Sequence, residues 1–370
     1  YQFLLLHGKT KKRGGRKNRM TKRERVIRTL NLQETDRVPV YDLLYNDAVI
    51  EYFTGRIPPP GEEGLKIACK AISKMLDMTR GVAGPNEPGI FTQSDGFTMR
   101  RNRWTTWIEE SPFKDETGAK EWLKMSIKDL QNTDVNRMAR EYLEYFKRVL
   151  NYVGDTIVLY AQTGTGLDEL RHSLGIELFS YISADDPGLI SEYLDAYTEL
   201  QVKFIHNIAQ EKLSPCTLTY GDIAAKGRLL HSPDWLRKEF FPRLERLNYA
   251  WHEHGVKCLF HSDGYIMDVI PDLIETGIDG LNPLETVAGM DLKEVKRLYG
   301  DKLFIAGGID VSQLLSNGTP EEVKEVCREA IKIGYPGYFI GSTTELDNGA
   351  KLENVLAMLE VAWEMKMAEL

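Results

Sequence analysis

Histidine and carboxylate side chains meet in one short stretch, residues 257–285, which reads KCLFHSDGYIMDVIPDLIETGIDGLNPLE. His261 and Asp263 stand two residues apart at the end of an apolar run. Alternate side chains of a strand share a face, so His261 lies with Leu259, and Asp263 joins them if the chain stays extended. An imidazole and a carboxylate aimed at one point can bind a metal ion or share a proton. Alternatively, Asp263 caps a helix that begins at Tyr265.

Short β-rich runs alternate with longer amphipathic runs from Met20 onward. Parallel strands can be joined only through a crossover, so this alternation predicts a parallel sheet covered by helices. Eight units predict an α/β fold closed into a (β/α)8 TIM barrel, with an open doubly wound sheet as the alternative. A Gly-rich dinucleotide loop would favour the open sheet, but none follows the first strand, so no nucleotide cofactor is expected. The expected strands are residues 37–44, 77–84, 156–164, 216–222, 256–264, 279–285, 303–310 and 337–347.

Two segments add to the predicted barrel. Residues 21–33 predict an N-terminal helical extension, with Thr21 as N-cap and Glu24 at the capping-box spacing. Residues 85–115 are rich in turn residues, Thr and Trp, and predict an inserted β-hairpin or small antiparallel patch. We expect the arginines of this insertion to pair with local acids; they are Arg100, Arg101 and Arg103.

Charge is unevenly distributed along the 370 residues, whose formal net charge is −8. Residues 1–19 carry seven Lys and Arg side chains and no acid, which leaves 40 basic and 55 acidic side chains in the rest. We expect residues 1–19 to be a basic disordered extension and residues 20–370 to form one domain. An acidic body repels nucleic acid. No stretch approaches the roughly 20 apolar residues of a membrane span, so we expect a cytoplasmic protein without a membrane or nucleic-acid partner.

Polar side chains follow six of the expected strands. The loops after the strands form the catalytic face of a TIM barrel, so these residues are the candidates for chemistry. The set is strongly acidic; its members include Gln162, Asp222, His261, Asp263, Asn282, Glu285, Asp310, Glu345 and Asp347.

Three of these side chains could bind a metal ion. A catalytic zinc site uses three protein ligands and one open position, which His261, Asp263 and Glu345 would provide, with Asp347 as an alternative to Glu345. An oxygen-rich set suits Mn, Fe or Mg as well as Zn, so zinc or another divalent metal is expected. The four cysteines are far apart and form no CxxC pair, so they indicate neither a disulfide framework nor a zinc knuckle.

Several blocks of the chain resemble the uroporphyrinogen decarboxylase superfamily. They are MTKRERVIRTLNLQETDRVPVYDL, YGDIAAKGRLLHSPDWLRKEFFPRLERL, HGVKCLFHSDGYIMDVIPDLIETGIDGLNPLE and FIAGGIDVSQLLSNGTPEEVKEVCREAI. The resemblance implies a (β/α)8 barrel from one of two branches. One branch decarboxylates the acetate arms of uroporphyrinogen without a cofactor. The other transfers methyl groups between a methylated corrinoid protein and a thiol or pterin acceptor, with zinc held by a His-x-Cys after the fifth strand and a Cys in the last loop.

The chain departs from both branches. The decarboxylase branch needs an Arg-rich motif after the first strand, where this chain has YDLLYNDAVIEY. Its Asp near the second strand is absent from TRGVAG, and its last-loop His is absent from STTELD. His261 matches the methyltransferase histidine, whereas Asp263 replaces the first Cys and Thr344 or Glu345 the second. Carboxylates are harder ligands than thiolates, so a nitrogen or oxygen acceptor such as a tetrahydropterin is expected instead of a thiol.

The resemblance therefore favours a methyltransferase that works with a corrinoid protein and a small-molecule substrate. His261, Asp263 and Glu345 would hold or replace the metal, and Asp222 and Glu285 would assist proton movement. One alternative is a decarboxylase of uroporphyrinogen or a related carboxylate, and a second is a non-catalytic binding protein; a homodimer is a candidate assembly. The candidate substrate-binding residues are Gln162, Asn282, Asp310 and Arg228.

Overall fold

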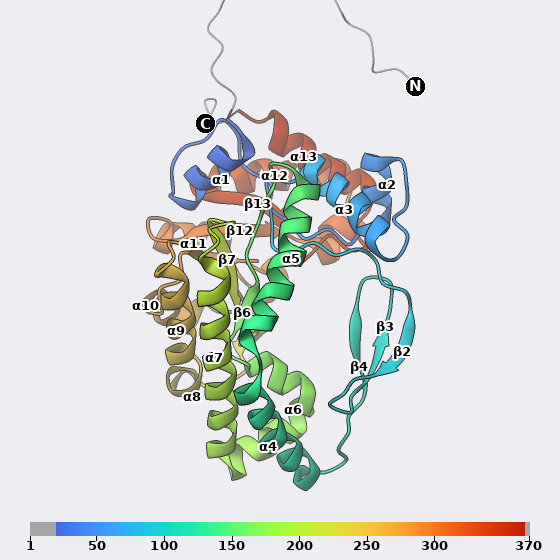
Figure 1. Cartoon of the computed structure of the whole chain (residues 1–370). Coiled ribbons are helices and arrows are strands. Elements are labelled where there is room, and N and C mark those ends of the chain that lie inside the picture. The colour runs from blue at the N-terminus through green and yellow to red at the C-terminus, as the bar shows by residue number, and fades with distance from the viewer. Residues whose placement is uncertain (1–19, 367–370) are drawn as a thin grey trace, which may run out of the picture.

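A computed structural model describes residues 20–366, and Figure 1 shows their arrangement. The prediction for residues 1–19 lies outside the described residues. Six strands form one parallel sheet in the order β13-β12-β11-β10-β7-β6. They are β6 (Gln162–Gly164), β7 (Cys216–Tyr220), β10 (Lys257–His261), β11 (Gly280–Asn282), β12 (Phe304–Ile309) and β13 (Tyr338–Ser342).

Two short strands and two bridges close this sheet into a ring. β1 (Met78–Thr79) pairs in parallel with β5 (Ile157–Val158), which precedes β6 in the chain. The segment expected as the first strand joins both edges, because Val40 forms a parallel bridge with Ile340 of β13 and Tyr41 forms one with Met78 of β1. The predicted eight-stranded barrel is thereby confirmed, although its first two strands are much shorter than expected.

Helices surround the ring, and their apolar faces form the outer core. Ser232 caps α8, and a break at Phe240 separates α8 from α9. The helices outside the ring are α2 (Asp47–Thr54), α3 (Glu62–Met75), α4 (Glu116–Asn132), α5 (Val135–Val153), α6 (Leu167–Asp185), α7 (Pro187–Ala209), α8 (Pro233–Glu239), α9 (Phe241–His252), α10 (Ile270–Glu275), α11 (Leu292–Tyr299), α12 (Pro320–Gly334) and α13 (Leu352–Glu364).

The barrel interior is a separate apolar cluster. Leu259 of β10 belongs to this inner cluster, whereas Cys258 and Phe260 belong to the outer one, as strand alternation predicts. Helix α1 (Lys22–Leu30) contributes Val26 and Leu30 to the inner cluster and so closes the end where the strands begin. The predicted capping box of Thr21 and Glu24 is present at its start. The opposite end of the barrel is therefore left for the site.

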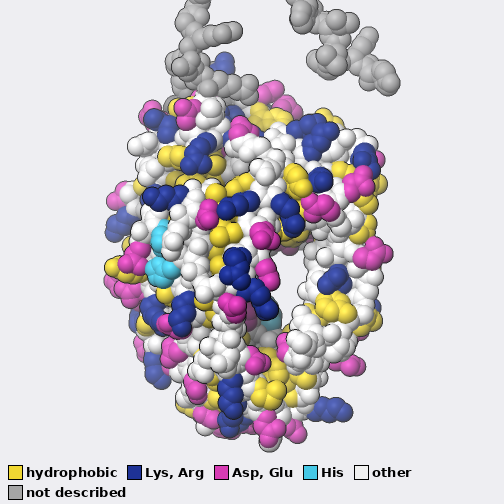
Figure 2. Space-filling view, viewed as in Figure 1, with side chains coloured by type: hydrophobic (Ala, Val, Ile, Leu, Met, Phe, Trp, Pro, Cys, Tyr) yellow, Lys and Arg dark blue, Asp and Glu magenta, His cyan; other side chains and the backbone are white. Residues whose placement is uncertain are grey.

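The insertion forms a small three-stranded antiparallel sheet, which contains the expected β-hairpin and one further strand. Its strands are β2 (Gly89–Thr92), β3 (Thr98–Arg101) and β4 (Thr106–Glu110), on the right in Figure 1. Trp104 stacks on Tyr45 at one end with ring centroids 5.4 Å apart, and Phe97 packs against Trp122 of α4 at the other. Figure 2 shows that the space between this sheet and the body stays open when side chains are drawn.

The arginines of the insertion largely behave as expected. Arg100 pairs with Glu109, and Nε of Arg103 lies 2.7 Å from Oδ2 of Asp47, so both are structural. Arg101 differs, because its guanidinium lies over the ring of Phe91 at 4.4 Å. No helix within residues 20–366 has both the length and the apolar character that a membrane crossing needs.

Candidate functional site

Three ligand atoms converge at the end of the barrel opposite α1. The ends of β7 and β10 lie side by side, with Tyr220 opposite His261, so the loop after each strand starts at the same rim. Asp222 and Asp263 stand in these loops, and one ligand atom from each of Asp222, His261 and Asp263 lies within 4.8 Å of the others. Nε2 of His261 is 3.9 Å from Oδ1 of Asp222 and 3.8 Å from Oδ1 of Asp263.

Asn282 fixes the orientation of the His261 ring. Oδ1 of Asn282 lies 2.7 Å from Nδ1 of His261, while its Nδ2 donates to the carbonyl of Ala306 at 3.0 Å. The amide oxygen must therefore accept, so Nδ1 of His261 carries the proton and Nε2 presents a lone pair to the two carboxylates. Burial and the nearby Arg80 lower the pKa of His261 to about 4, which keeps the ring neutral near pH 7.

Asp263 does not cap a helix, so that interpretation is wrong. The first helical turn after it is a 3-10 turn, Met267–Val269, whose N-cap residue Ile266 makes no side-chain capping bond. Oδ1 of Asp263 is buried and has no hydrogen-bond partner among the described residues. Burial, followed by the negative charges of Asp222 and Glu285, raises the pKa of Asp263 to about 7. A buried carboxylate oxygen without a donor is stabilised by a bound cation or a proton, so a metal ion fits this site.

Two residues of α6 hold the main chain of Asp222. Its amide donates to Oδ2 of Asp168 at 3.0 Å, and its carbonyl accepts from Nη1 of Arg171 at 2.7 Å. Asp168 and Arg171 also pair with each other at 2.5 Å. Sequence analysis missed both residues; their spacing of three on one helix was the only local signal.

Arg80 is the cation of the site. Its Nη1 lies 3.2 Å from Nδ1 of His261, and its Nη2 donates to the carbonyl of Thr344 at 2.9 Å and to Oε2 of Glu345 at 3.1 Å. Because Asn282 already accepts from Nδ1, Arg80 acts on His261 through its charge. Glu345 therefore pairs with Arg80. Asp222 is the third potential metal ligand, in the position that the sequence analysis assigned to Glu345.

The other predicted residues have varied surroundings. Oε2 of Glu285 accepts from the amide of Gly264 at 2.8 Å and so steadies the loop after β10. Gln162 is exposed on β6 at the same rim. Both carboxylate oxygens of Asp310 cap the π-helical turn Val311–Leu315, and Arg228 is exposed on β9 (Arg228–Leu229). None of these four residues belongs to the metal-ligand group found among the described residues.

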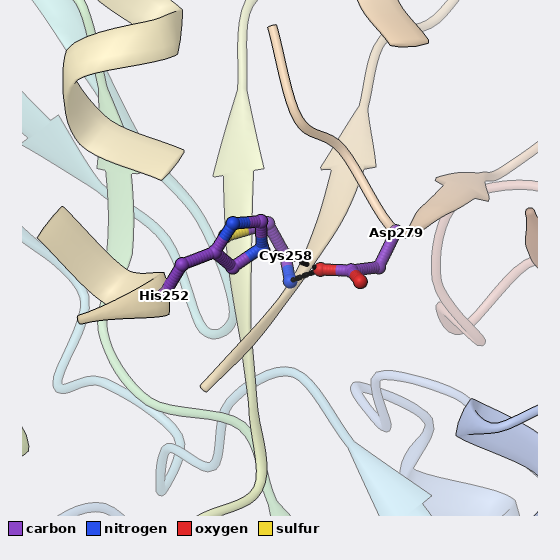
Figure 3. Close-up of side chains that lie close together, drawn as sticks. All are labelled: His252, Cys258 and Asp279. Atoms are coloured by element: carbon purple, nitrogen blue, oxygen red, sulfur yellow. Dashed lines mark hydrogen bonds and ion pairs between the residues drawn. The ribbon is translucent and has the colours of Figure 1, made fainter. Parts of the chain in front are cut away.

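A second group of potential ligands lies where β10 begins, and Figure 3 shows it. Oδ2 of Asp279 accepts from Nε2 of His252 and from the amide of Cys258, both at 2.8 Å, and Oδ1 accepts from Lys257 at 2.9 Å. Burial raises the pKa of the Cys258 thiol well above its usual value. Both carboxylate oxygens of Asp279 thus accept hydrogen bonds within the protein, and this group is a structural latch between neighbouring strands.

Comparisons with known proteins agree with this architecture. A methyltransferase structure from Methanosarcina mazei superposes with a TM-score of 0.66 and 18% identity, covering 93% of this chain and 98% of that one. A methylated-thiol--coenzyme M methyltransferase of the same organism is 27% identical over 193 residues, which are 52% of this chain and 49% of that protein. The chain therefore spans about half the length of this curated relative.

The family comparison covers the strands that carry the site. The family model described as uroporphyrinogen decarboxylase (URO-D) matches residues 127–365, which include Asp222, His261 and Asp263. With more than half of its length in this match, the chain belongs to the uroporphyrinogen decarboxylase family.

Proposed function

We propose that the protein is a methyltransferase that moves a methyl group between a corrinoid protein and a small-molecule nitrogen or oxygen acceptor of the pterin type. The observation that carries the proposal is the convergence of Nε2 of His261 with the carboxylates of Asp222 and Asp263. His261 also stands at the position of the histidine expected for the methyltransferase branch. The names of the two relatives above support the same branch.

The ligand group fits a divalent metal ion. Asp222, His261 and Asp263 would hold it, since one carboxylate oxygen is buried without a partner and the imidazole lone pair faces both acids. Such an ion, when bound, polarises the acceptor and favours loss of its proton. Two carboxylates and one imidazole form a harder ligand set than thiolates, which is the reason for a nitrogen or oxygen acceptor.

Other residues of the site position the ligands and accept the proton. Asn282 orients His261, and Asp168 with Arg171 holds Asp222. The methyl group would leave the corrinoid without the electron pair of its old bond, and a carboxylate of the rim would take the proton that the acceptor loses. Glu285 is the proposed proton acceptor, because it borders the loop of Asp263.

Charge at the rim disfavours the decarboxylase alternative. A porphyrinogen with several carboxylates needs several cations, yet Arg80 already pairs with Glu345 and Arg171 with Asp168. Asp222, Asp263 and Glu285 add negative charge around Arg80. We therefore do not propose porphyrinogen decarboxylation. The corrinoid partner and a homodimer stay predictions.

The proposal is tested by following the visible spectrum of methylcob(III)alamin after addition of the protein, a divalent metal salt and tetrahydrofolate. We expect demethylation with the wild-type protein and loss of it with His261→Ala. His252→Ala is the matched control, because it removes the histidine of the structural latch. Elemental analysis of wild type and Asp263→Ala gives a second readout, with metal expected in the wild type only. A wild-type protein that demethylates no methylcobalamin with any nitrogen or oxygen acceptor would overturn the proposal.

A further inference from the structure

A small pocket of about 160 Å³ adjoins the site on the side of Arg80. It lies where β1 and β5 separate, because these strands pair only at Met78–Ile157 and Thr79–Val158. Helix α5 covers its outer side. The lining residues that carry the argument are Arg80, Tyr142, Phe146, Tyr160, Ala161 and Gln162.

Aromatic rings form the body of this pocket. Tyr142 stacks on Phe146, and Phe146 stacks on Tyr160, each with ring centroids 5.4 Å apart and interplanar angles of 19° and 20°. Tyr160 in turn stacks on Trp251, so the wall is braced by the outer core. An apolar cavity of about 150 Å³ is known to hold benzene, so this volume accommodates one six-membered ring. Flat aromatic walls favour a flat occupant.

The end of the pocket next to the site is polar. Arg80 is only 7% exposed, and its Nε is buried without a hydrogen-bond partner among the described residues. A guanidinium N–H can only donate, so this atom requires an acceptor that residues 20–366 do not supply. Gln162 lines the same pocket and can both donate and accept. Nη1 of Arg80 is 3.2 Å from Nδ1 of His261, which places this end beside the metal ligands.

We propose that this pocket binds a planar six-membered ring carrying an acceptor oxygen, with the oxygen directed to Arg80 and Gln162 and the reacting atom left outside on the side of His261. The inference rests on the proposed function, because it names the part of the methyl acceptor that the protein recognises. The pyrimidine half of a tetrahydropterin has this chemistry, and its reacting nitrogen lies in the adjacent ring. A phenolic ring is the other source of the same chemistry.

Binding without any corrinoid tests the pocket separately from methyl transfer. 6-Methyltetrahydropterin and phenol are each titrated calorimetrically into the full chain under anaerobic conditions. Ala161→Leu fills part of the pocket and leaves the main-chain carbonyl of Ala161 available to Thr217. Ala196→Leu is the matched control, a half-buried alanine on α7 outside the pocket. We expect the probe that binds the wild type to bind Ala161→Leu at least about ten-fold more weakly. Its affinity for Ala196→Leu should be unchanged.

The outcomes separate the two proposals. Weaker pterin binding in Ala161→Leu supports the pocket with a pterin occupant, and the same result for phenol alone supports it with a single-ring occupant. Equal affinity in wild type and Ala161→Leu, or no binding of either probe to the wild type, overturns the pocket proposal. A pterin that binds in the pocket but accepts no methyl group would instead overturn the proposed function and leave the pocket in place.

Discussion

Nδ1 of His261 lies 2.7 Å from Oδ1 of Asn282, and this contact decides which ring nitrogen faces the acids. Asn282 is itself held by the carbonyl of Ala306 on the next strand, so its amide cannot turn without losing a buried hydrogen bond. Three neighbouring strands, β10, β11 and β12, thereby fix one tautomer of one histidine. The lone pair of Nε2 is left for a metal ion between Asp222 and Asp263.

Replacing Asn282 should therefore weaken metal binding without removing a ligand. In Asn282→Ala the ring of His261 can turn and change tautomer, and we expect divalent metal affinity to fall by about 10- to 100-fold. Titration with Mn²⁺ or Zn²⁺ measures the change. Asn248→Ala is the control, because Asn248 is a fully buried asparagine that bonds to Thr276 away from the rim. Unchanged affinity in Asn282→Ala would show that the ring is held by other contacts.

Asp168 should act on the metal site through Asp222. Asp168→Ala removes the acceptor of the Asp222 amide and the partner of Arg171, so the carboxylate of Asp222 loses its fixed position. We expect metal affinity to fall by about ten-fold. Glu239→Ala is the matched control, because Glu239 forms a comparably buried pair with Arg243 on α8 and α9. Both variants should lose stability, but only Asp168→Ala should lose affinity. Equal affinities in the two variants would contradict the positioning role.

Local sequence patterns were sufficient to predict the barrel but not the lengths of its strands. Alternating β-rich and amphipathic runs are properties of single segments, so the parallel ring and the capping box of Thr21 could be predicted. The extent of pairing depends on neighbouring strands. Val40 and Tyr41 make only isolated bridges, and the insertion has a third strand, β4, that pairs with β3.

The sequence predicted those site residues that a local pattern marks, but not the contacts between distant segments. His261, Asp222 and Asp263 could be identified because His261 ends a strand and each aspartate stands two residues beyond a strand end. Arg80 could not be placed at the site from the sequence, because its contacts with His261 and Glu345 join segments that are far apart along the chain. Asp263 resembled a helix cap because a glycine and an apolar run follow it, but the chain delays its first turn until Met267.

Asp77 should stabilise the closed end of the barrel. It is fully buried and accepts from Nη1 of Arg25 at 2.7 Å, from Arg37 at 2.8 and 3.0 Å, and from the amide of Val40 at 2.9 Å. Asp77→Ala leaves two guanidinium groups without this partner, so we expect the free energy of unfolding to fall by about 3–5 kcal/mol. Urea denaturation measures this loss.

An exposed ion pair provides the control for Asp77. Arg56 and Glu63 pair at 2.7 Å, with side chains 59% and 61% exposed. Glu63→Ala should change the free energy of unfolding by less than about 1 kcal/mol. Metal affinity should stay unchanged in both variants, since neither residue contacts the rim. Similar losses in Asp77→Ala and Glu63→Ala would contradict the assignment of a buried network.

His231 should make the protein less stable as the pH falls. Burial and the nearby Arg171 lower the pKa of His231 to about 4, from an ordinary value near 6.5. Between these values the unfolded chain binds a proton that the folded chain does not, so acid favours unfolding and stability is lost as the pH falls from 6.5 toward 4. Partial exposure reduces the expected loss to about 1–2 kcal/mol.

His231→Phe isolates this contribution. The ring of His231 stacks on Trp235 with centroids 4.2 Å apart and meets the edge of Phe179, while its Nε2 is buried without a partner. Phenylalanine preserves the stacking and cannot be protonated, so the free energies of unfolding of the two proteins should diverge progressively below pH 6.5. Carboxylates titrate in the same range in both proteins and cancel in the difference. Urea unfolding curves measured from pH 7 to pH 4.5 that run parallel for wild type and His231→Phe would show that His231 is protonated in the folded protein.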